Sequence, residues 1–408
     1  MKTYLIDYGY NHIDICIINL LKLILFVILI LKFTQLKIKE HPFYLAIRKP
    51  IIEKNKEKKK SLIKGRIYLN QCLNGSNHHQ YYSKNNPKVT AIIPIFNSEK
   101  TIEASLLSIQ NQNLTKVEII LINDFSKDNT SEIINDKQRK DHRIKIINNH
   151  RNMGTLYSRS IGALMAKGEY IFCLDNDDMF FDEDIFDFFY KKGKNESLDI
   201  IGFQTVNLWN YSHGIEDMRD LYTYQYPNEY FVKQPELGRW MVTFEGKFLV
   251  HNNMIWDKSI KTSIYQKAVN LIGEKRYSNY LIWAEDTCIN FIIFNLAESF
   301  KYIHKYGILH FKSTKTASFI QPIEHKLYGE IFFLDVIFEF SKNNTDKNLA
   351  VEQILFMEKQ FNLNNNYNNP NSVKLKSIIR NILKCQYIST INKRKVKKIF
   401  KNYLIQLF

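Results

Sequence analysis

The stretch Lys167-Gly-Glu-Tyr-Ile-Phe-Cys-Leu-Asp175-Asn-Asp177-Asp178 places three carboxylates directly after a short apolar run. A glycine turn followed by Tyr-Ile-Phe-Cys-Leu is typical of a buried strand. Open α/β sheets hold their ligands at the carboxyl ends of such strands. Hard divalent cations that bind nucleotide phosphates take carboxylate oxygens as ligands. An acidic cap at a helix start is the alternative for this turn, and the preceding residues weigh against it.

Apolar strand patterns alternate with amphipathic helix patterns in the chain before this turn. The expected strands are 89–96, 117–124, 144–147 and 170–174, and the expected helices are 97–111, 126–140 and 156–166. This alternation predicts an α/β fold with a mainly parallel sheet, right-handed crossovers and a ligand at the strands' carboxyl ends. Further on, the patterns predict strands at 198–209 and 302–311 and helices at 288–296, 323–342 and 347–361.

The net charge of +16 over 408 residues sits at the two ends of the chain. Residues 1–66 and 373–408 are both strongly basic, which leaves 67–372 at about −3. A groove that follows a phosphate backbone needs a basic core, so no nucleic-acid partner is expected. The five cysteines are scattered and without metal-ligand spacing, so they predict neither a disulfide framework nor a zinc site.

Residues 15–33 are apolar enough for a single membrane span or signal anchor if Lys22 lies near a boundary. A buried or interfacial helix is the alternative. Orientation stays open, because basic residues after the segment favour a cytosolic carboxyl-terminal side while six N-glycosylation sequons suit a lumenal one. We expect a single-pass membrane protein, in the endoplasmic reticulum or Golgi if the source is eukaryotic.

The composition divides the chain into four parts. We expect an N-terminal membrane segment at 1–33, a basic linker or stalk at 34–87, an α/β domain at 88–320 and a helical basic region at 321–408. The α/β domain divides into two halves, 88–209 and 210–320. The basic end of the chain either lies on an anionic membrane face or packs on the core as a solvated helix.

Five ordered motifs, each at the end of a predicted strand or the start of a predicted helix, resemble the family 2 glycosyltransferases of the GT-A fold. The motifs are Pro94-x-Phe96-Asn97-x-Glu99, Asn123-Asp124-x-Ser126-x-Asp128-x-Thr130, Asn152-x-Gly154 with Arg159, Asp175-Asn176-Asp177-Asp178, and Glu285-Asp286. The resemblance covers roughly half of the chain, from about 88 to 208 and more loosely from 247 to 318. Each motif alone is weak, and their order makes the set specific.

The resemblance implies a nucleotide-diphospho-sugar transferase domain at 88–320 that uses a UDP-sugar, with a nucleotide-binding half at 88–209 and an acceptor half at 210–320. The nucleotide pocket would be lined by Pro94, Phe96, Asn97, Glu99, Asp124, Ser126, Asn152, Gly154, Arg159, Asp175 and Asn176. A carboxylate at Asp124 can accept the uracil N–H, and Arg159 would face the nucleotide or its phosphates. Helix capping is the plain structural alternative for Asn97 and Ser126.

The resemblance also implies a metal and a general base. Asp177 would bind Mn²⁺ or Mg²⁺ that bridges the diphosphate, with Asp178 sharing that task and His310 as a further candidate ligand. Sequence does not divide the task between the two aspartates. Asp286, with Glu285 as the fallback, would deprotonate the acceptor hydroxyl in an inverting displacement.

Several departures from the family pattern limit the inference. Asn123 replaces a usual Asp, and Phe125 replaces the usual Gly of its turn, so we expect the backbone to differ there. The processive Q-x-x-R-W motif is missing after the base, which argues against polymer extrusion. The expected function is transfer of one sugar from UDP to a glycan or glycolipid hydroxyl. A polyprenyl-phosphate acceptor and a non-catalytic nucleotide- or carbohydrate-binding module remain the alternatives, and the donor sugar, linkage and oligomeric state stay open.

Overall fold

The computed structural model describes the following parts of the chain: 86–209, 229–234, 243–244, 247–248, 254–278, 280–281 and 283–312, with scattered helical residues between 60 and 72 and between 329 and 341. The expected membrane segment, the helix at 347–361 and the basic region at 373–408 lie outside these residues. Within the described part, no helix combines the length and the apolar character that crossing a membrane requires.

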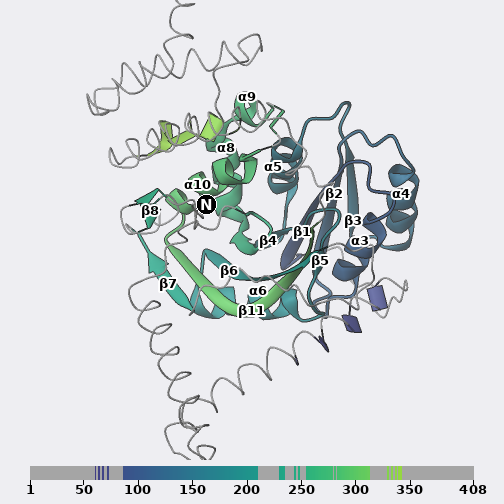
Figure 1. Cartoon of the computed structure of the whole chain (residues 1–408), viewed down its shortest axis with the longest axis horizontal. Coiled ribbons are helices and arrows are strands. Elements are labelled where there is room, and N and C mark those ends of the chain that lie inside the picture. Colours follow the sequence, from purple (N-terminus) through teal and green to yellow (C-terminus); the bar gives the residue numbers. More distant parts are fainter. Residues whose placement is uncertain are drawn as a thin grey trace, which may run out of the picture. The chain divides into compact units, whose positions relative to one another are not determined.

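Helices and strands alternate through the first half of the domain, as Figure 1 shows. The strands are β1 (Val89–Ile95), β2 (Val117–Asn123), β3 (Ile144–Asn148), β4 (Tyr170–Cys173), β5 (Met179–Phe180), β6 (Ile200–Trp209), β7 (Tyr230–Lys233), β8 (Thr243–Phe244), β9 (Lys247–Phe248), β10 (Lys258–Lys261) and β11 (Ser299–Lys312). The helices are α3 (Ile102–Gln110), α4 (Thr130–Lys140), α5 (Thr155–Met165), α6 (Ile185–Glu196), α8 (Thr262–Ile272), α9 (Glu274–Tyr277) and α10 (Glu285–Leu296).

The main sheet has the order β3-β2-β1-β4-β10-β6-β11-β5, with β7 paired to β11. The first four strands pair in parallel, as the βα alternation predicts. The prediction of a mainly parallel sheet holds only in part for the second half, where β6 and β11 pair in parallel but other strands do not. There β10 is antiparallel to both β4 and β6, and β5 and β7 are antiparallel to β11. The sheet is therefore mixed, with α/β architecture.

The two faces of the sheet carry different cores. In β4, Ile171 and Cys173 belong to a core cluster with residues of α5, α8 and α10, which Figure 1 shows gathered together. Phe172 points to the opposite face, as the strand period of two requires. There its ring lies 4.8 Å from that of Phe186 in α6 and 6.2 Å from that of Phe203 in β6. Helices on both faces bury β4 completely and fix the acidic turn that follows it.

Three helices, α6, α8 and the short α9, were not predicted, and two helices begin later than expected. α6 is rich in charged and aromatic residues, which obscures its helical period. α8 buries Tyr265, Ala268, Val269 and Ile272 at helical spacing, a signal that the sequence analysis missed. α3 begins at Ile102 rather than at 97, and α4 at Thr130 rather than at 126. The residues before each helix form loops whose polar groups bond across to each other. These loops form part of the candidate site.

Ordered packing begins before the expected domain boundary at 88. Tyr68 and Cys72 are buried, and the Tyr68 hydroxyl donates a hydrogen bond of 2.8 Å to the Ser108 carbonyl. Burial raises the pKa of the Cys72 thiol to about 11, as expected for a small buried hydrophobe. The expectation of a linker through residue 87 is therefore wrong for these positions. At the other end, Phe333 packs 6.0 Å from the ring of Phe291 in α10.

Candidate functional site

The loops after β1 and β2 are joined by hydrogen bonds between their motif residues. Asn97 donates its backbone N–H to Ser126 Oγ at 3.1 Å, and its Oδ1 accepts the Lys127 N–H at 2.8 Å. The Glu99 N–H donates to Asp128 Oδ2 at 3.0 Å. These bonds satisfy backbone groups that precede the two helices. The side chains of Ser126 and Asp128, and the amide oxygen of Asn97, thus hold the two loops together.

Each loop presents an exposed phenylalanine. Phe96 follows β1 and is 43% exposed, and Phe125 follows β2 and is 39% exposed. Pro94, by contrast, is buried within β1. Phe125 has φ of +67°, in the region that favours glycine. The expectation that Phe changes the backbone of this turn is therefore wrong, because the turn keeps a positive φ and Phe adopts it under strain.

Asp124 organises the turn between β3 and α5. Its Oδ1 accepts bonds of 2.7 Å from Asn149 Nδ2 and the Met153 N–H, and its Oδ2 accepts the Gly154 N–H at 2.7 Å. Gly154 has φ of +86°, which is why a glycine stands there. The Asn152 side chain also accepts from the Gly154 N–H, at 3.2 Å. A carboxylate offers about four acceptor sites, so roughly one remains at Asp124 for a ligand.

The acidic turn after β4 divides into exposed and buried parts. Asp175, Asn176 and Asp177 are partly exposed, whereas Asp178 is buried. The Asn176 side chain bonds to the Ser98 hydroxyl, so the turn is tied to the loop after β1. Burial, with the nearby carboxylates of Asp178 and Asp175, raises the pKa of Asp177 to about 7. The carboxylate of Asp177 is thus destabilised in the absence of a cation.

Asp178 positions His310. Its two oxygens lie 3.0 and 2.8 Å from His310 Nδ1, and its Oδ1 also accepts the Phe311 N–H at 2.9 Å. The Trp256 ring stacks on the imidazole at 4.8 Å. Burial raises the pKa of Asp178, and His310 opposes that rise. Asp178 and Trp256 thus fix the orientation of the His310 imidazole.

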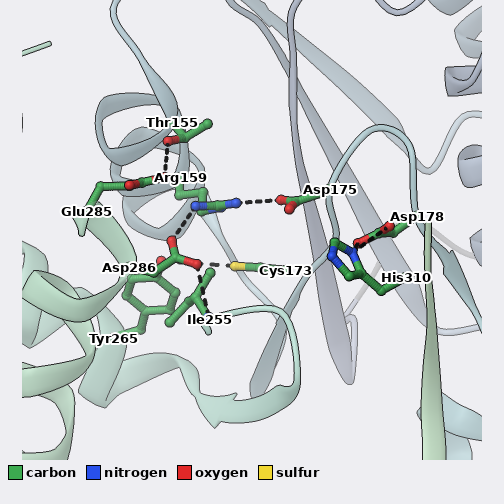
Figure 2. Close-up of polar contacts among 10 residues, drawn as sticks. All are labelled: Thr155, Arg159, Cys173, Asp175, Asp178, Ile255, Tyr265, Glu285, Asp286 and His310. Atoms are coloured by element: carbon green, nitrogen blue, oxygen red, sulfur yellow. Dashed lines mark hydrogen bonds and ion pairs between the residues drawn. The ribbon is translucent and has the colours of Figure 1, made fainter. Parts of the chain in front are cut away.

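Arg159 connects the acidic turn after β4 to the Glu285-Asp286 motif in α10. It points from α5 between two carboxylates, as Figure 2 shows: Nη2 lies 2.5 Å from Asp175 Oδ1, and Nη1 bonds to Asp286 Oδ1. The side chain is buried. Burial disfavours its charge, but the carboxylates of Asp286 and Asp175 raise the pKa of Arg159 well above its ordinary value. Both terminal nitrogens are therefore engaged by protein carboxylates.

Asp286 and Glu285 occupy the first turn of α10. Asp286 Oδ2 accepts the Ile255 N–H at 3.2 Å, and Glu285 Oε1 accepts the Thr155 hydroxyl at 2.9 Å. Burial raises the pKa of Asp286 to about 7, against the opposing effect of Arg159. Burial raises the pKa of Glu285 as well. A carboxyl group that titrates near neutrality is suited to general-base chemistry.

The donor set at the β4 turn suits a cation that is shared with a ligand. Within the ranges that the structure describes, no group of three or more His, Cys, Asp and Glu side chains is arranged to hold a metal ion. A Mg²⁺-type site takes one or two carboxylates and completes its octahedron with phosphate and water oxygens. Asp177, partly exposed and with its carboxylate destabilised, fits that role better than Asp178, whose oxygens are occupied.

Several residues around the site carry no motif and were not predicted. They are Thr155, Trp256, Tyr265 and Tyr280. Tyr280 is 47% exposed and lies near Asp124, because its ring is 3.4 Å from where a side chain on Gly154 would begin. For Tyr280, the sequence signal that could have been used is an aromatic residue shortly before the Glu285-Asp286 pair. Trp256 and Tyr265 had no such signal, because their contacts depend on the order of the strands.

Comparisons with known proteins agree with this geometry. Residues 90–250 match the profile of glycosyl transferase family 2. The uncharacterized glycosyltransferase EpsJ of Bacillus subtilis is 28% identical over 216 residues, 53% of this chain and 58% of EpsJ. A GalNAc(5)-diNAcBac-PP-undecaprenol beta-1,3-glucosyltransferase of Campylobacter jejuni is 37% identical over 93 residues, 22% of this chain and 30% of that enzyme. The chain thus spans less than two thirds of the length of these curated relatives.

A solved structure with a bound sugar nucleotide shares the fold. The crystal structure of S. aureus TarS 1-349 in complex with UDP-GlcNAc superposes with a TM-score of 0.54 at 16% identity. The superposition covers 78% of this chain and 91% of that chain. At this identity the likeness speaks for the fold alone. It shows that the described domain has a GT-A-like α/β fold, and within this domain residues 90–250 match glycosyl transferase family 2.

Proposed function

We propose that this protein is an inverting, metal-dependent glycosyltransferase that moves one sugar from a UDP-sugar to an acceptor hydroxyl. One observation carries the proposal: Asp175 in the turn after β4 and Asp286 in α10 both form ion pairs with the buried guanidinium of Arg159. A carboxylate that titrates near neutrality thus stands beside the acidic turn where a sugar nucleotide is expected.

The chemistry assigned to the protein residues is a single displacement. The Asp286 carboxylate takes the proton of the acceptor hydroxyl while the acceptor oxygen attacks the anomeric carbon. The bond from that carbon to the diphosphate oxygen breaks, and UDP departs with the electron pair. Arg159 and the Ile255 N–H hold the carboxylate in place through hydrogen bonds to its two oxygens. Glu285, bonded to Thr155, is the fallback base.

Asp177 is the residue that would hold Mn²⁺ or Mg²⁺, with His310 presented by Asp178 as a further ligand or diphosphate contact. When bound, the cation would neutralise negative charge on the leaving diphosphate. UDP as the nucleotide is supported by the sugar nucleotide in the TarS complex and by the free acceptor site at Asp124. Three exposed aromatic rings lie around Asp124: Phe125 follows it, Phe96 follows Ile95, whose carbonyl accepts the Asp124 N–H, and Tyr280 lies beside Gly154.

The test is a calorimetric titration of UDP into the full-length protein, with and without Mn²⁺. We expect binding that needs the metal in the wild type and is lost in Asp177→Asn. Asp136→Asn is the matched control, because Asp136 is an exposed aspartate of α4, remote from the β4 turn in sequence and bonded to Lys140. UDP binding that is equal with and without metal, or unchanged in Asp177→Asn, would contradict the metal assignment.

A lipid-linked acceptor is the nearest alternative to a free glycan. The Campylobacter relative acts, by its name, on an undecaprenol diphosphate glycan, and a glycolipid or polyprenyl phosphate fits a protein with the apolar segment at 15–33. Incubation with a radiolabelled UDP-sugar and a membrane extract separates these cases. Label in the organic phase supports a lipid acceptor, and label in water-soluble glycan supports the first choice. No label in either phase, with metal-dependent UDP binding intact, would favour a non-catalytic binding module.

We also propose that residues 15–33 anchor the protein in a membrane as a single span. The protein should then stay with the membrane pellet after alkaline carbonate and move to the detergent phase. Release by carbonate would contradict the span and favour an interfacial helix.

A further inference from the structure

The position of Arg159 differs from the one that its motif suggests. The resemblance places this arginine toward the nucleotide or its phosphates. In the structure its residue exposure is 4%, and both terminal nitrogens bond to carboxylates from other elements, as Figure 2 shows. A ligand would have to displace one of these carboxylates to take a bond from a terminal nitrogen. The side chain is therefore better placed to act on Asp175 and Asp286 than on phosphate.

A guanidinium is suited to hold two carboxylates in fixed orientation. It is planar, always charged, and presents its donors in a rigid fork. The Nε of Arg159 has no hydrogen-bond partner among the residues that the structure describes, and its two terminal nitrogens bond to Asp286 and Asp175. A buried charge that loses its partners is strongly destabilising, which keeps the fork and both carboxylates together.

We propose that Arg159 is a positioning residue, which orients the Asp286 carboxylate toward the acceptor, keeps it ionised and ties it to Asp175 on the donor side. The inference deepens the proposed function and rests on the assignment of Asp286 as the base. It gives the arginine of this motif a role in the acceptor half of the reaction. Asp175 on the donor side and Asp286 on the acceptor side then pair with the same guanidinium, that of Arg159.

The surroundings of Asp286 explain why its charge depends on Arg159. The titratable groups that face it come from its own helix, from α5, from β4 and the turn after it, and from α8: Glu285, Arg159, Cys173, Asp175 and Tyr265. Burial and the neighbouring carboxylates disfavour the ionised form of Asp286, and Arg159 opposes them. Removing the guanidinium of Arg159 while Asp286 stays buried would therefore raise the pKa of Asp286 further.

The test compares Arg159→Met and Arg159→Lys with the wild type. The rate of sugar transfer at saturating donor and metal is measured from about pH 5.5 to 9.5, and UDP affinity is measured at each end. We expect the acid limb of Arg159→Met to move up by at least about one pH unit, with the rate at pH 7 down about tenfold or more and partly recovered at high pH. UDP affinity should change by less than about threefold. Arg159→Lys, which keeps the charge without the fork, should lie between the two.

Arg143→Met is the matched control. Arg143 is also buried and also bonded to an aspartate, Asp141, at 2.9 Å, but it belongs to the segment between α4 and β3. Its loss should lower stability and leave the acid limb of the rate profile where it is. An Arg159→Met profile that also keeps its midpoint, or a loss of UDP affinity of about tenfold with an unmoved profile, would overturn the proposal and return Arg159 to the nucleotide.

A second measurement does not depend on activity. The carboxyl carbon of Asp286, assigned with Asp286→Asn in ¹³C-aspartate-labelled protein, is titrated by NMR in wild type, in Arg159→Lys and in Arg159→Met. If Arg159→Met does not fold, the double variant Arg159→Met with Asp175→Asn is used in its place. This variant removes one of the two carboxylates that Arg159→Met alone leaves without their guanidinium. A midpoint that is higher without Arg159 supports the positioning role even if no transfer is found, which would count against the proposed function alone. An unmoved midpoint overturns the positioning role.

Discussion

At the scale of single residues, the assignment of the base makes the sharpest prediction. Asp286→Asn keeps the size of the side chain and removes the proton acceptor. General-base catalysis is commonly worth about 10² to 10⁴ in rate, so transfer should fall by that factor while UDP affinity stays within about twofold. Initial rates and calorimetry on the same preparation check this. Wild-type turnover in Asp286→Asn would move the role to Glu285, which Glu285→Gln then tests.

The strain at Phe125 makes a second prediction at this scale. A residue with a side chain at φ of +67° costs about 1–2 kcal/mol, which glycine largely avoids. Both Phe125→Gly and Phe125→Ala remove the ring and its contact with Lys127, whose Nζ lies 3.4 Å from the ring centroid. We expect Phe125→Gly to be more stable than Phe125→Ala by roughly 1 kcal/mol in urea unfolding. Equal stability of the two variants would show that the turn relaxes.

At the scale of elements, the site depends on the two loops that precede α3 and α4. Asp128 accepts the Glu99 N–H at 3.0 Å and the Thr130 N–H at 3.1 Å, so its carboxylate closes both loops. Asp128→Ala should lower the free energy of unfolding by roughly 1–2 kcal/mol, since hydrogen bonds to charged groups are worth about that much. UDP affinity should fall too, because the loops carry Phe96 and Phe125. Denaturant unfolding and calorimetry give the two values.

The control for that prediction is Asp136→Ala, at an exposed aspartate in the same helix, α4. Asp136 pairs only with solvent-exposed Lys140 and Arg139 among its described contacts, and such pairs contribute little. Asp136→Ala should leave both the free energy of unfolding and the UDP affinity nearly unchanged. If Asp128→Ala behaves like this control, the hydrogen bonds between the loops do not support the site.

At the scale of the whole molecule, the buried base links folding to pH. The folded pKa of Asp286, about 7, lies above the value of about 4 expected in the unfolded chain. The folded state therefore binds more protons between these two values, and the stability from Asp286 is full below about pH 4 and is lost as pH rises through 7. The difference in unfolding free energy between wild type and Asp286→Asn should thus fall by roughly 1–3 kcal/mol from pH 5 to pH 8, measured with a chelator present. A difference that does not vary with pH would contradict the raised pKa.

The first half of the fold could be predicted from local patterns. Four strands follow apolar runs of the sequence, which is typical of strands covered on both faces of the sheet: 89–95, 117–123, 144–148 and 170–173. Each such run can be recognised from its own residues, without knowledge of the rest of the chain. The carboxyl-terminal position of the acidic turn follows from the parallel pairing of these strands. The antiparallel β10, which lies between β4 and β6, could not be predicted, because four residues of mixed polarity carry no sign of their neighbours.

By itself, then, the sequence determined the order of the βα units and which polar residues stand at the strand ends, since turn residues and apolar periods are local properties of the chain. Only the tertiary structure decided which of these residues meet. Arg159 bonds to a carboxylate 127 positions away, and Asp178 to a histidine 132 positions away. Such pairs depend on strand order and helix packing over the whole sheet. That is why Arg159 and Asp178, expected at the nucleotide and the metal, were found holding Asp286 and His310.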